Sequence, residues 1–316
     1  MGKKVLLFAD VGIDDTIALI YASLSKEVDI VGIVADYGNV PRKMGLRNIT
    51  YLTRLFPFSP DTKVILGAEK PMTGENPVFY PEIHGEQGLG YLTPPEDLSP
   101  NGYSENFYEV VSIINKYAGE LTIVNTGRLT SLASMYILFN DLMDQVNEVY
   151  VMGGAFWVPG NVTAVSEANF NGDPIAAKIV FRYAKNLTII PLNVTEHAIV
   201  TPQMVDYIQS KGKAKIIKPL LDFYYQFYKR RNPSIVGSPV HDALTLIAAI
   251  NNSMFSFGTY PVYMDINSGV TKGQSIADLR PSPSMTNSER RHRIAFSFDY
   301  PLFYHDFMSI MTGETV

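Results

Sequence analysis

The sequence contains no cysteine, a single tryptophan and no long apolar run. The lack of cysteine excludes disulfides, thiolate metal sites and a thiol nucleophile. A membrane span needs about 20 apolar residues, and a signal peptide needs a longer apolar core than the N-terminal MGKKVLLFAD supplies. We therefore expect a cytoplasmic protein with no membrane partner.

Basic clusters are also missing. Lys and Arg total 26, Asp and Glu total 31, and the net charge is −5. Proteins that bind nucleic acids need a basic surface along the phosphate backbone, so we expect no nucleic-acid partner. A chain of 316 residues is long enough for one large domain or two small ones. Because we find no linker or repeat, we expect a single domain over residues 1–316.

Short apolar runs alternate with segments of helical periodicity along the chain. The runs, which are too short for helices, lie at residues 4–8, 28–35, 64–66, 121–124, 149–152 and 187–190. The helical segments lie at residues 14–25, 44–55, 128–139 and 174–183, and two more helices are expected within 201–231. This alternation predicts an α/β fold with an open, mostly parallel β-sheet flanked by helices on both faces, and extra helices toward the C-terminus.

Two segments interrupt the alternation. Residues 67–103 are rich in proline, glycine and glutamate, and loops of this length are usually functional. The second helix expected within 201–231 is aromatic and includes Tyr224, Tyr225 and Tyr228. These aromatic side chains would pack in the core or in a subunit interface, or else contact a ligand.

Three aspartates, Asp10, Asp14 and Asp15, fall within six residues where the first expected strand meets the first helix. Their mutual repulsion is costly unless a cation or a helix N-terminus offsets it. Gly12 permits a tight turn that could aim the three carboxylates at one point. Ligands that are all oxygens favour calcium or magnesium. The same residues could instead form a solvated acidic turn with an N-capping aspartate.

Further polar residues follow other expected strands, and ligands of parallel sheets bind at the carboxyl ends of strands. These residues are Asn39, Asn125-Thr126-Gly127, Met152-Gly153-Gly154, Glu167-Ala168-Asn169 and His241-Asp242. Their positions predict one convergent pocket.

These motifs resemble those of the inosine-uridine preferring nucleoside hydrolases, calcium enzymes that cleave the N-glycosidic bond of ribonucleosides. The family's opening motif, D-x-D-P-G-x-D-D, matches at Asp10, Gly12, Asp14 and Asp15. Its G-N, M-G-G, E-x-N-x-x-x-D-P and H-D motifs match in order at residues 38–39, 152–154, 167–174 and 241–242. The resemblance runs from residue 5 to about residue 280 and implies the family's fold and activity.

The resemblance also implies a role for each matching residue. The calcium ligands would be Asp10, Asp15, Asp242 and the carbonyl of Thr126. The nucleoside would contact Asp14, Asn39, His84, Met152, Glu167 and Asn169. Asp10 would be the general base for the attacking water, and His241 would lie beside the leaving base and protonate it. Because members of the family are usually homodimers or homotetramers, a homo-oligomer is implied as well.

Departures from the family motifs concern Phe8, Val11, which replaces a proline, and Arg128. Phe8 stands where the opening motif begins with an aspartate, and the loss of a supporting carboxylate typically costs about 10–100-fold in metal affinity or activity. One hypothesis is that Asp36, at the end of the neighbouring strand, replaces that charge. Arg128 stands where the family has a proline. Trp157, which follows the M-G-G motif, could stack on a base or pack within the fold.

We therefore expect a calcium-dependent hydrolase that releases ribose and a free purine or pyrimidine base in nucleoside salvage. A hydrolase of a non-standard nucleoside is one alternative. A nucleoside- or ribose-binding protein that has lost turnover is another. A phosphoryl-transfer enzyme with an aspartate nucleophile fits poorly, because it needs a second acid where Gly12 stands.

Overall fold

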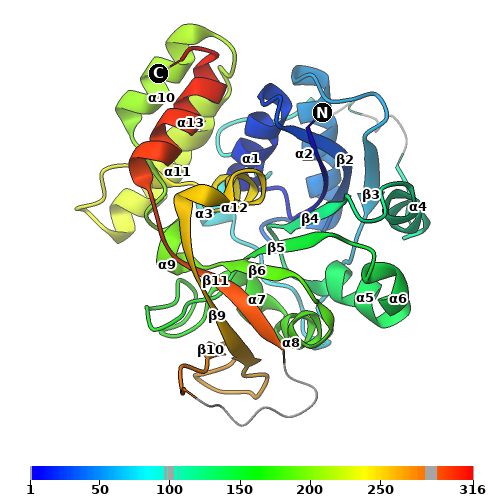
Figure 1. The fold of residues 1–316 in the computed structure, drawn as a ribbon. Helices are drawn as coiled ribbons and strands as arrows, with labels where there is room; N and C mark the ends of the chain where they lie inside the picture. The colour runs from blue at the N-terminus through cyan, green and yellow to red at the C-terminus, as the bar shows by residue number, and fades with distance from the viewer. Residues whose placement is uncertain (1, 96–97, 99–102, 106, 282–289, 316) are drawn as a thin grey trace.

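The computed structural model describes residues 2–95, 98, 103–105, 107–281 and 290–315 (Figure 1). In these ranges nine strands form one sheet in the order β10-β9-β11-β6-β5-β4-β1-β2-β3. The strands are β1 (Lys3–Ala9), β2 (Val28–Ala35), β3 (Lys63–Leu66), β4 (Thr122–Asn125), β5 (Glu148–Met152), β6 (Leu187–Ile190), β9 (Phe255–Met264), β10 (Ser275–Ala277) and β11 (Arg291–Phe298). A separate antiparallel pair joins β7 (Ile199–Val200) to β8 (Ser238–Pro239).

Most of the sheet is parallel, as the sequence predicts. All neighbours from β3 to β11 run parallel, whereas β9 is antiparallel to both β11 and β10. Successive residues of β1 point to opposite faces, so Val5 and Leu7 pack on one side while Leu6 and Phe8 pack on the other. Since both faces are covered, the strand has no polar face, which explains its continuous apolar run.

Helices cover both faces of the sheet, also as expected. One apolar core lies under α1 (Ile13–Leu24), α2 (Arg42–Leu55), α10 (Pro202–Lys211), α11 (Ile217–Arg231), α12 (His241–Ile250) and α13 (Tyr300–Thr312). The other core lies under α4 (Tyr108–Lys116), α5 (Thr130–Leu138) and α8 (Pro174–Tyr183). In Figure 1, α10, α11 and α13 stand together beyond the sheet, so the extra C-terminal helices are confirmed. No helix within the described ranges is long and apolar enough to cross a membrane.

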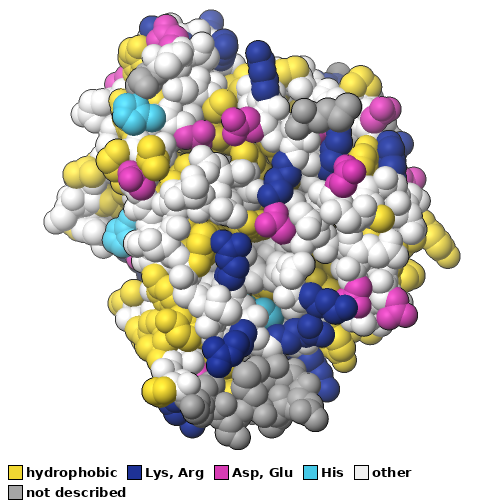
Figure 2. Space-filling model, in the orientation of Figure 1, with side chains coloured by type: hydrophobic (Ala, Val, Ile, Leu, Met, Phe, Trp, Pro, Cys, Tyr) yellow, Lys and Arg dark blue, Asp and Glu magenta, His cyan; other side chains and the backbone are white. Residues whose placement is uncertain are grey.

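Short helices occupy several connections. They are α3 (Pro81–His84), α6 (Asn140–Met143), α7 (Ala168–Gly172), α9 (Leu192–Thr195) and a 3₁₀ turn at Asn252–Met254. The long segment 67–103 contains α3, and its residues 96–97 and 99–102 lie outside the described part of the chain. Charged side chains of both signs are spread over the face drawn in Figure 2. The expectation of one domain over residues 1–316 stays a prediction.

Candidate active site

The predicted pocket lies at the carboxyl ends of the central strands. Asp10 follows β1, Asn39 follows β2, Thr126 follows β4, and Met152 ends β5. A cavity of about 750 Å³ opens there. Nine of the predicted site residues line it: Asp14, Asn39, His84, Thr126, Met152, Glu167, Asn169, His241 and Asp242. Asp10 and Asp15 lie beneath this lining and are buried.

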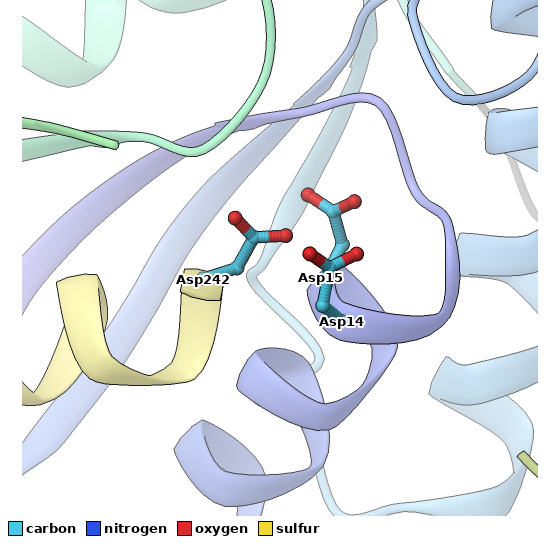
Figure 3. Close-up of side chains that lie close together, drawn as sticks. All are labelled: Asp14, Asp15 and Asp242. Atoms are coloured by element: carbon cyan, nitrogen blue, oxygen red, sulfur yellow. The ribbon is translucent and has the colours of Figure 1, made fainter. Parts of the chain in front are cut away.

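Two helix N-termini bring three carboxylates together. Asp14 and Asp15 lie in the first turn of α1, Asp242 lies in the first turn of α12, and the two helices pack against each other. Figure 3 shows the three side chains pointing toward one another. Each offers an oxygen atom within 4.8 Å of the others. The positive ends of both helices therefore face the acid cluster, which we define as Asp14, Asp15 and Asp242.

Asp10 lies next to the acid cluster and is held by Asn39. The backbone N–H of Asn39 donates to Asp10 Oδ2 at 2.8 Å, and its side-chain amide donates to Asp10 Oδ1 at 3.1 Å. The same amide also donates to Asp15 Oδ2 at 3.2 Å. A Cβ atom on Gly38 would lie 1.7 Å from Asp10 Oδ2, so only glycine fits at this position.

Burial and mutual repulsion make these carboxyl groups hard to ionise. Burial, followed by repulsion from neighbouring carboxylates, raises the pKa of Asp14 to about 7 and the pKa values of Asp10 and Asp242 well above the usual range. Asp14 Oδ1 is buried and has no hydrogen-bond partner among the described residues. An unpartnered oxygen among crowded carboxylates fits a hard divalent cation such as calcium.

The acid cluster shares Asp15 and Asp242 with the expected set of calcium ligands. The tight cluster contains Asp14, which was expected to bind the sugar, and Asp10 is not one of its three members. Thr126 joins β4 to the cluster, because its hydroxyl donates to Asp15 Oδ1 at 2.7 Å. The assignments of Asp10 and the Thr126 carbonyl as ligands stay predictions.

Glu167 and Asn169 form the wall beside Thr126. The Glu167 carboxylate caps α7 by accepting from the backbone N–H groups of Asn169 and Phe170, and it also accepts from Gly154. The Asn169 amide donates to the Thr126 carbonyl at 2.8 Å and to the Met152 carbonyl at 3.2 Å. These bonds fix both polar side chains at the pocket surface.

A chain of hydroxyl and imidazole groups runs from Asp14 to Thr195. The Tyr224 hydroxyl donates to Asp14 Oδ2 at 3.2 Å and lies 3.3 Å from the Tyr228 hydroxyl. The Tyr228 hydroxyl lies 3.0 Å from His241 Nε2, and His241 Nδ1 lies 2.8 Å from the Thr195 hydroxyl. The sequence left Tyr224 and Tyr228 open between packing and ligand contact, and both line the pocket. Sequence reasoning missed Thr195.

Two histidines of the pocket, His84 and His241, are neutral in this structure. Burial lowers the pKa of His84 to about 3 and the pKa of His241 to about 4. His84 Nδ1 accepts a hydrogen bond from the backbone N–H of Ile13 at 3.1 Å and so caps the first turn of α1. Its 3.8 Å approach to Asp14 is therefore not an ion pair.

The structure also locates Phe8, Asp36 and Trp157. Phe8 is fully buried in the core under α4, α5 and α8, and its carbonyl accepts the backbone N–H of Thr126. Asp36 accepts hydrogen bonds from the Ser131 hydroxyl and the Ala68 backbone, so its contacts give no support to the idea that it replaces a charge at the acid cluster. Trp157 is 58% exposed and stacks on Phe296, away from the main cavity.

Comparisons with known proteins agree with this site. The family model described as inosine-uridine preferring nucleoside hydrolase matches residues 5–305. A probable uridine nucleosidase 2 from Arabidopsis thaliana is 34% identical over 278 residues, which cover 87% of this chain and 85% of the plant protein. An inosine-uridine preferring nucleoside hydrolase from Crithidia fasciculata is 26% identical over 309 residues, or 96% of each chain.

The fold agrees as well. A solved structure, a purine-preferring ribonucleoside hydrolase from Gardnerella vaginalis, superposes with a TM-score of 0.90 at 29% identity over 98% of each chain. The family match covers most of the chain, and the motifs that it contains surround one cavity. The chain is therefore an enzyme of the inosine-uridine preferring nucleoside hydrolase family.

Proposed function

We propose that this enzyme uses calcium to hydrolyse the N-glycosidic bond of ribonucleosides, releasing ribose and a free purine or pyrimidine base. One observation carries the proposal: the acid cluster and the Tyr228–His241 pair meet at the same cavity, where Tyr224 links them by donating to Asp14. A nucleoside has a diol at one edge of its sugar and a base attached at C1′. The cavity thus offers a cation site for the diol and hydrogen-bonding groups for the base.

The acid cluster would hold the calcium ion, together with Asp10 and the carbonyl of Thr126. When bound, calcium would supply Lewis acidity and a fixed anchor for the sugar diol. Asn39, Glu167 and Asn169 would orient the sugar, since their polar groups are held at the cavity wall by hydrogen bonds.

Asp10 would be the general base that takes a proton from the attacking water. Asn39 holds both of its oxygens, which fixes the orientation that proton transfer requires. As the glycosidic bond breaks, positive charge develops on the sugar in an oxocarbenium-like transition state. The buried carboxylates beside the sugar would stabilise that charge, because they are shielded from bulk water.

The leaving base would receive its proton from the Tyr228–His241 pair. Burial keeps His241 neutral at pH 7, so a preformed imidazolium is not the donor. We infer that a Tyr228 hydroxyl or His241 N–H proton moves to the base, and that Tyr224, next in the hydrogen-bonded chain, helps to replace it. The oxygen of water bonds to C1′ as the C1′–N bond breaks, Asp10 takes a proton from the water, and the base takes one from the Tyr228–His241 pair. Release of the Asp10 proton to solvent and uptake of one by the hydrogen-bonded chain complete the balance.

The test is ribose release from inosine, uridine, cytidine and adenosine, with added calcium and with a chelator. We expect release that stops with the chelator and in Asp10→Ala. Asp306→Asn is the matched control, because Asp306 is a half-buried carboxylate hydrogen-bonded to Tyr21 in the helical layer. No release from any of the four nucleosides, despite calcium binding, would instead support the nucleoside-binding protein or the hydrolase of a non-standard nucleoside.

We also propose that the enzyme acts in the cytoplasm as a homodimer or homotetramer. Both statements rest on the resemblance and on the sequence, and light scattering on the purified protein tests the second. A monomer at micromolar concentration would contradict it.

A further inference from the structure

Arg128 is a buried cation behind the wall of the cavity. It lies in the turn between β4 and α5 and is 3% exposed. One guanidinium nitrogen donates to the carbonyl of Val78 at 2.5 Å, and the guanidinium lies 4.9 Å from the centre of the Tyr37 ring. A Cβ atom on Gly172 would lie 2.3 Å from Arg128 Nε, so the end of α7 leaves room for this side chain. Val78, Tyr37 and Gly172 therefore surround the Arg128 side chain and leave room for it.

Arg128 fixes the segment that carries Tyr80. Val78 and Tyr80 belong to the loop that leads into α3, and the backbone N–H of Tyr80 donates to the Asn39 carbonyl at 3.2 Å. The Tyr80 side chain lines the cavity, whereas Arg128 does not. Burial raises the pKa of the Tyr80 hydroxyl, and the charges of Glu167 and Asp10 add to this, whereas the Arg128 guanidinium acts in the opposite direction. Glu167 lines the same cavity, and Asn39, which accepts the Tyr80 backbone N–H, also holds Asp10.

The chemistry of a nucleoside indicates which part of the substrate reaches Tyr80. The base and the 5′-hydroxymethyl group are attached to C1′ and C4′, on opposite sides of the ring oxygen. If the diol faces the acid cluster and the base faces Tyr228 and His241, the hydroxymethyl group points to the remaining wall. That wall contains Glu167 and Tyr80.

We propose that Tyr80 contacts the 5′-hydroxyl group of the nucleoside and that Arg128 is a positioning residue that holds Tyr80 in place from behind. This inference rests on the proposed function, because it takes its substrate orientation from the acid cluster and His241. Tyr80 and Arg128 together would then determine specificity for the sugar, independently of the base. The same inference also gives a role to the arginine that stands where the family has a proline.

The test compares uridine with 5′-deoxyuridine, which has the same glycosidic bond but lacks the 5′-hydroxyl. We expect Tyr80→Phe to lower kcat/KM for uridine by about 3–10-fold, the range for one lost hydrogen bond, and to leave 5′-deoxyuridine unchanged. Arg128→Met should reduce the preference for uridine over 5′-deoxyuridine. Arg128→Lys, which keeps the charge, should restore part of that preference. Tyr207→Phe is the matched control, because Tyr207 bonds to Glu314 on the surface.

Several outcomes would overturn the proposal. If Tyr80→Phe slows both substrates equally, Tyr80 supports the fold or the chemistry rather than the 5′-hydroxyl. If neither kcat/KM value changes in Tyr80→Phe, the contact does not exist, although the hydrolase activity stands. Arg128→Met could fail to fold, and thermal melting detects this, but Tyr80→Phe still decides the question.

Failure of the proposed function is a separate result. If the wild-type enzyme releases no ribose from uridine, the same comparison is made with dissociation constants from calorimetry. The proposal then requires uridine to bind about 3–10-fold more tightly than 5′-deoxyuridine in the wild type and not in Tyr80→Phe. Equal binding, or no binding of either nucleoside, would overturn it.

Discussion

The cavity contains two groups of side chains on different supports, which we call its acid end and its base end, and Tyr224 links them by donating to Asp14. At the acid end, hydrogen bonds run to backbone groups: Gly12 N–H donates to Asp15, Asn39 N–H donates to Asp10, and Thr126 N–H donates to the Phe8 carbonyl. At the base end, Tyr224 and Tyr228 project from α11, and the hydrogen bonds there join one side chain to another. The acid end gathers carboxyl groups that a bound cation would ionise, whereas the base end consists of groups that are neutral at pH 7.

This difference separates two tasks. A cation and an oxocarbenium-like sugar both need fixed negative charge, which a rigid strand edge supplies without reorganisation. Proton delivery to a base needs groups that can both donate and accept, which hydroxyls and a neutral imidazole can do. The following changes should therefore affect calcium binding at one end and leaving-group chemistry at the other.

The largest effect is expected from the acid end. Asp242→Asn removes one of the three carboxylates, and we expect calcium affinity to fall by at least about 100-fold, the upper range for loss of a mere supporting group. Activity at low calcium should fall with it. Calorimetric titration of calcium measures the effect, with Asp306→Asn as control. An unchanged dissociation constant would show that the acid cluster is not the calcium site.

A change at the base end should leave calcium binding intact. We expect His241→Gln to lower kcat for uridine by about 100-fold, the lower range for lost proton donation. A riboside with a p-nitrophenolate leaving group, which departs without a proton, should be cleaved at nearly the wild-type rate. Tyr225→Phe is the control from the same helix, since the Tyr225 hydroxyl bonds to the Ile235 carbonyl. Equal losses on both substrates would mean that His241 acts on the sugar.

Substitutions of Phe8 test whether a carboxylate at position 8 reaches the acid cluster or is buried in the apolar core. The family's aspartate at this position would place a charge among apolar side chains, so Phe8→Asp should lower the free energy of unfolding by at least about 3 kcal/mol. Phe8→Leu should cost less, since it stays apolar. Chemical denaturation measures both variants. If Phe8→Asp is stable and binds calcium more tightly, the carboxylate reaches the acid cluster and the core is not the reason for Phe8.

The acid end was more predictable from the sequence than the base end. Asp10, Asp14 and Asp15 lie within one short motif at a strand–helix junction, so local pattern places them together. Tyr224 contacts Asp14 across 210 positions of the chain, and no local periodicity encodes that contact. The roles of Thr195 and Tyr80 were missed for the same reason, since each depends on a partner supplied by another element.

One part of the fold was also more predictable from the sequence than the other. The parallel strands were predictable, because burial on both faces leaves uninterrupted apolar runs. Strands β9, β10 and β11 were not predicted, since the burial pattern of β9 has no regular period of two and the strand includes Pro261 and Gly258. Helix α5 begins at Thr130 rather than at residue 128, because Arg128 lies in the turn behind the cavity.

The smallest effect is expected from pH, and it also distinguishes the two ends. The raised pKa values of Asp14 and Asp36, both about 7, mean that the folded protein without calcium holds protons that the unfolded chain has already lost. Stability in a chelator should therefore fall as pH rises from about 4, and the last part of this loss lies between about pH 6.5 and 8. The buried histidines have lowered pKa values, so their stabilising effect is complete above about pH 6.5 and does not oppose the last part of this loss.

Calcium should reverse this loss, because it binds ionised carboxylates and so binds more tightly as pH rises. Thermal melting at pH 6.5, 7.2 and 8 with chelator or calcium measures both slopes. Asp36→Asn separates the contributions: it should reduce the slope in chelator and leave calcium affinity unchanged, because Asp36 bonds to Ser131 and Ala68 rather than to the acid cluster. A weaker calcium affinity in Asp36→Asn would instead extend the acid end of the cavity to β2 and would support the hypothesis that Asp36 replaces the charge absent at position 8.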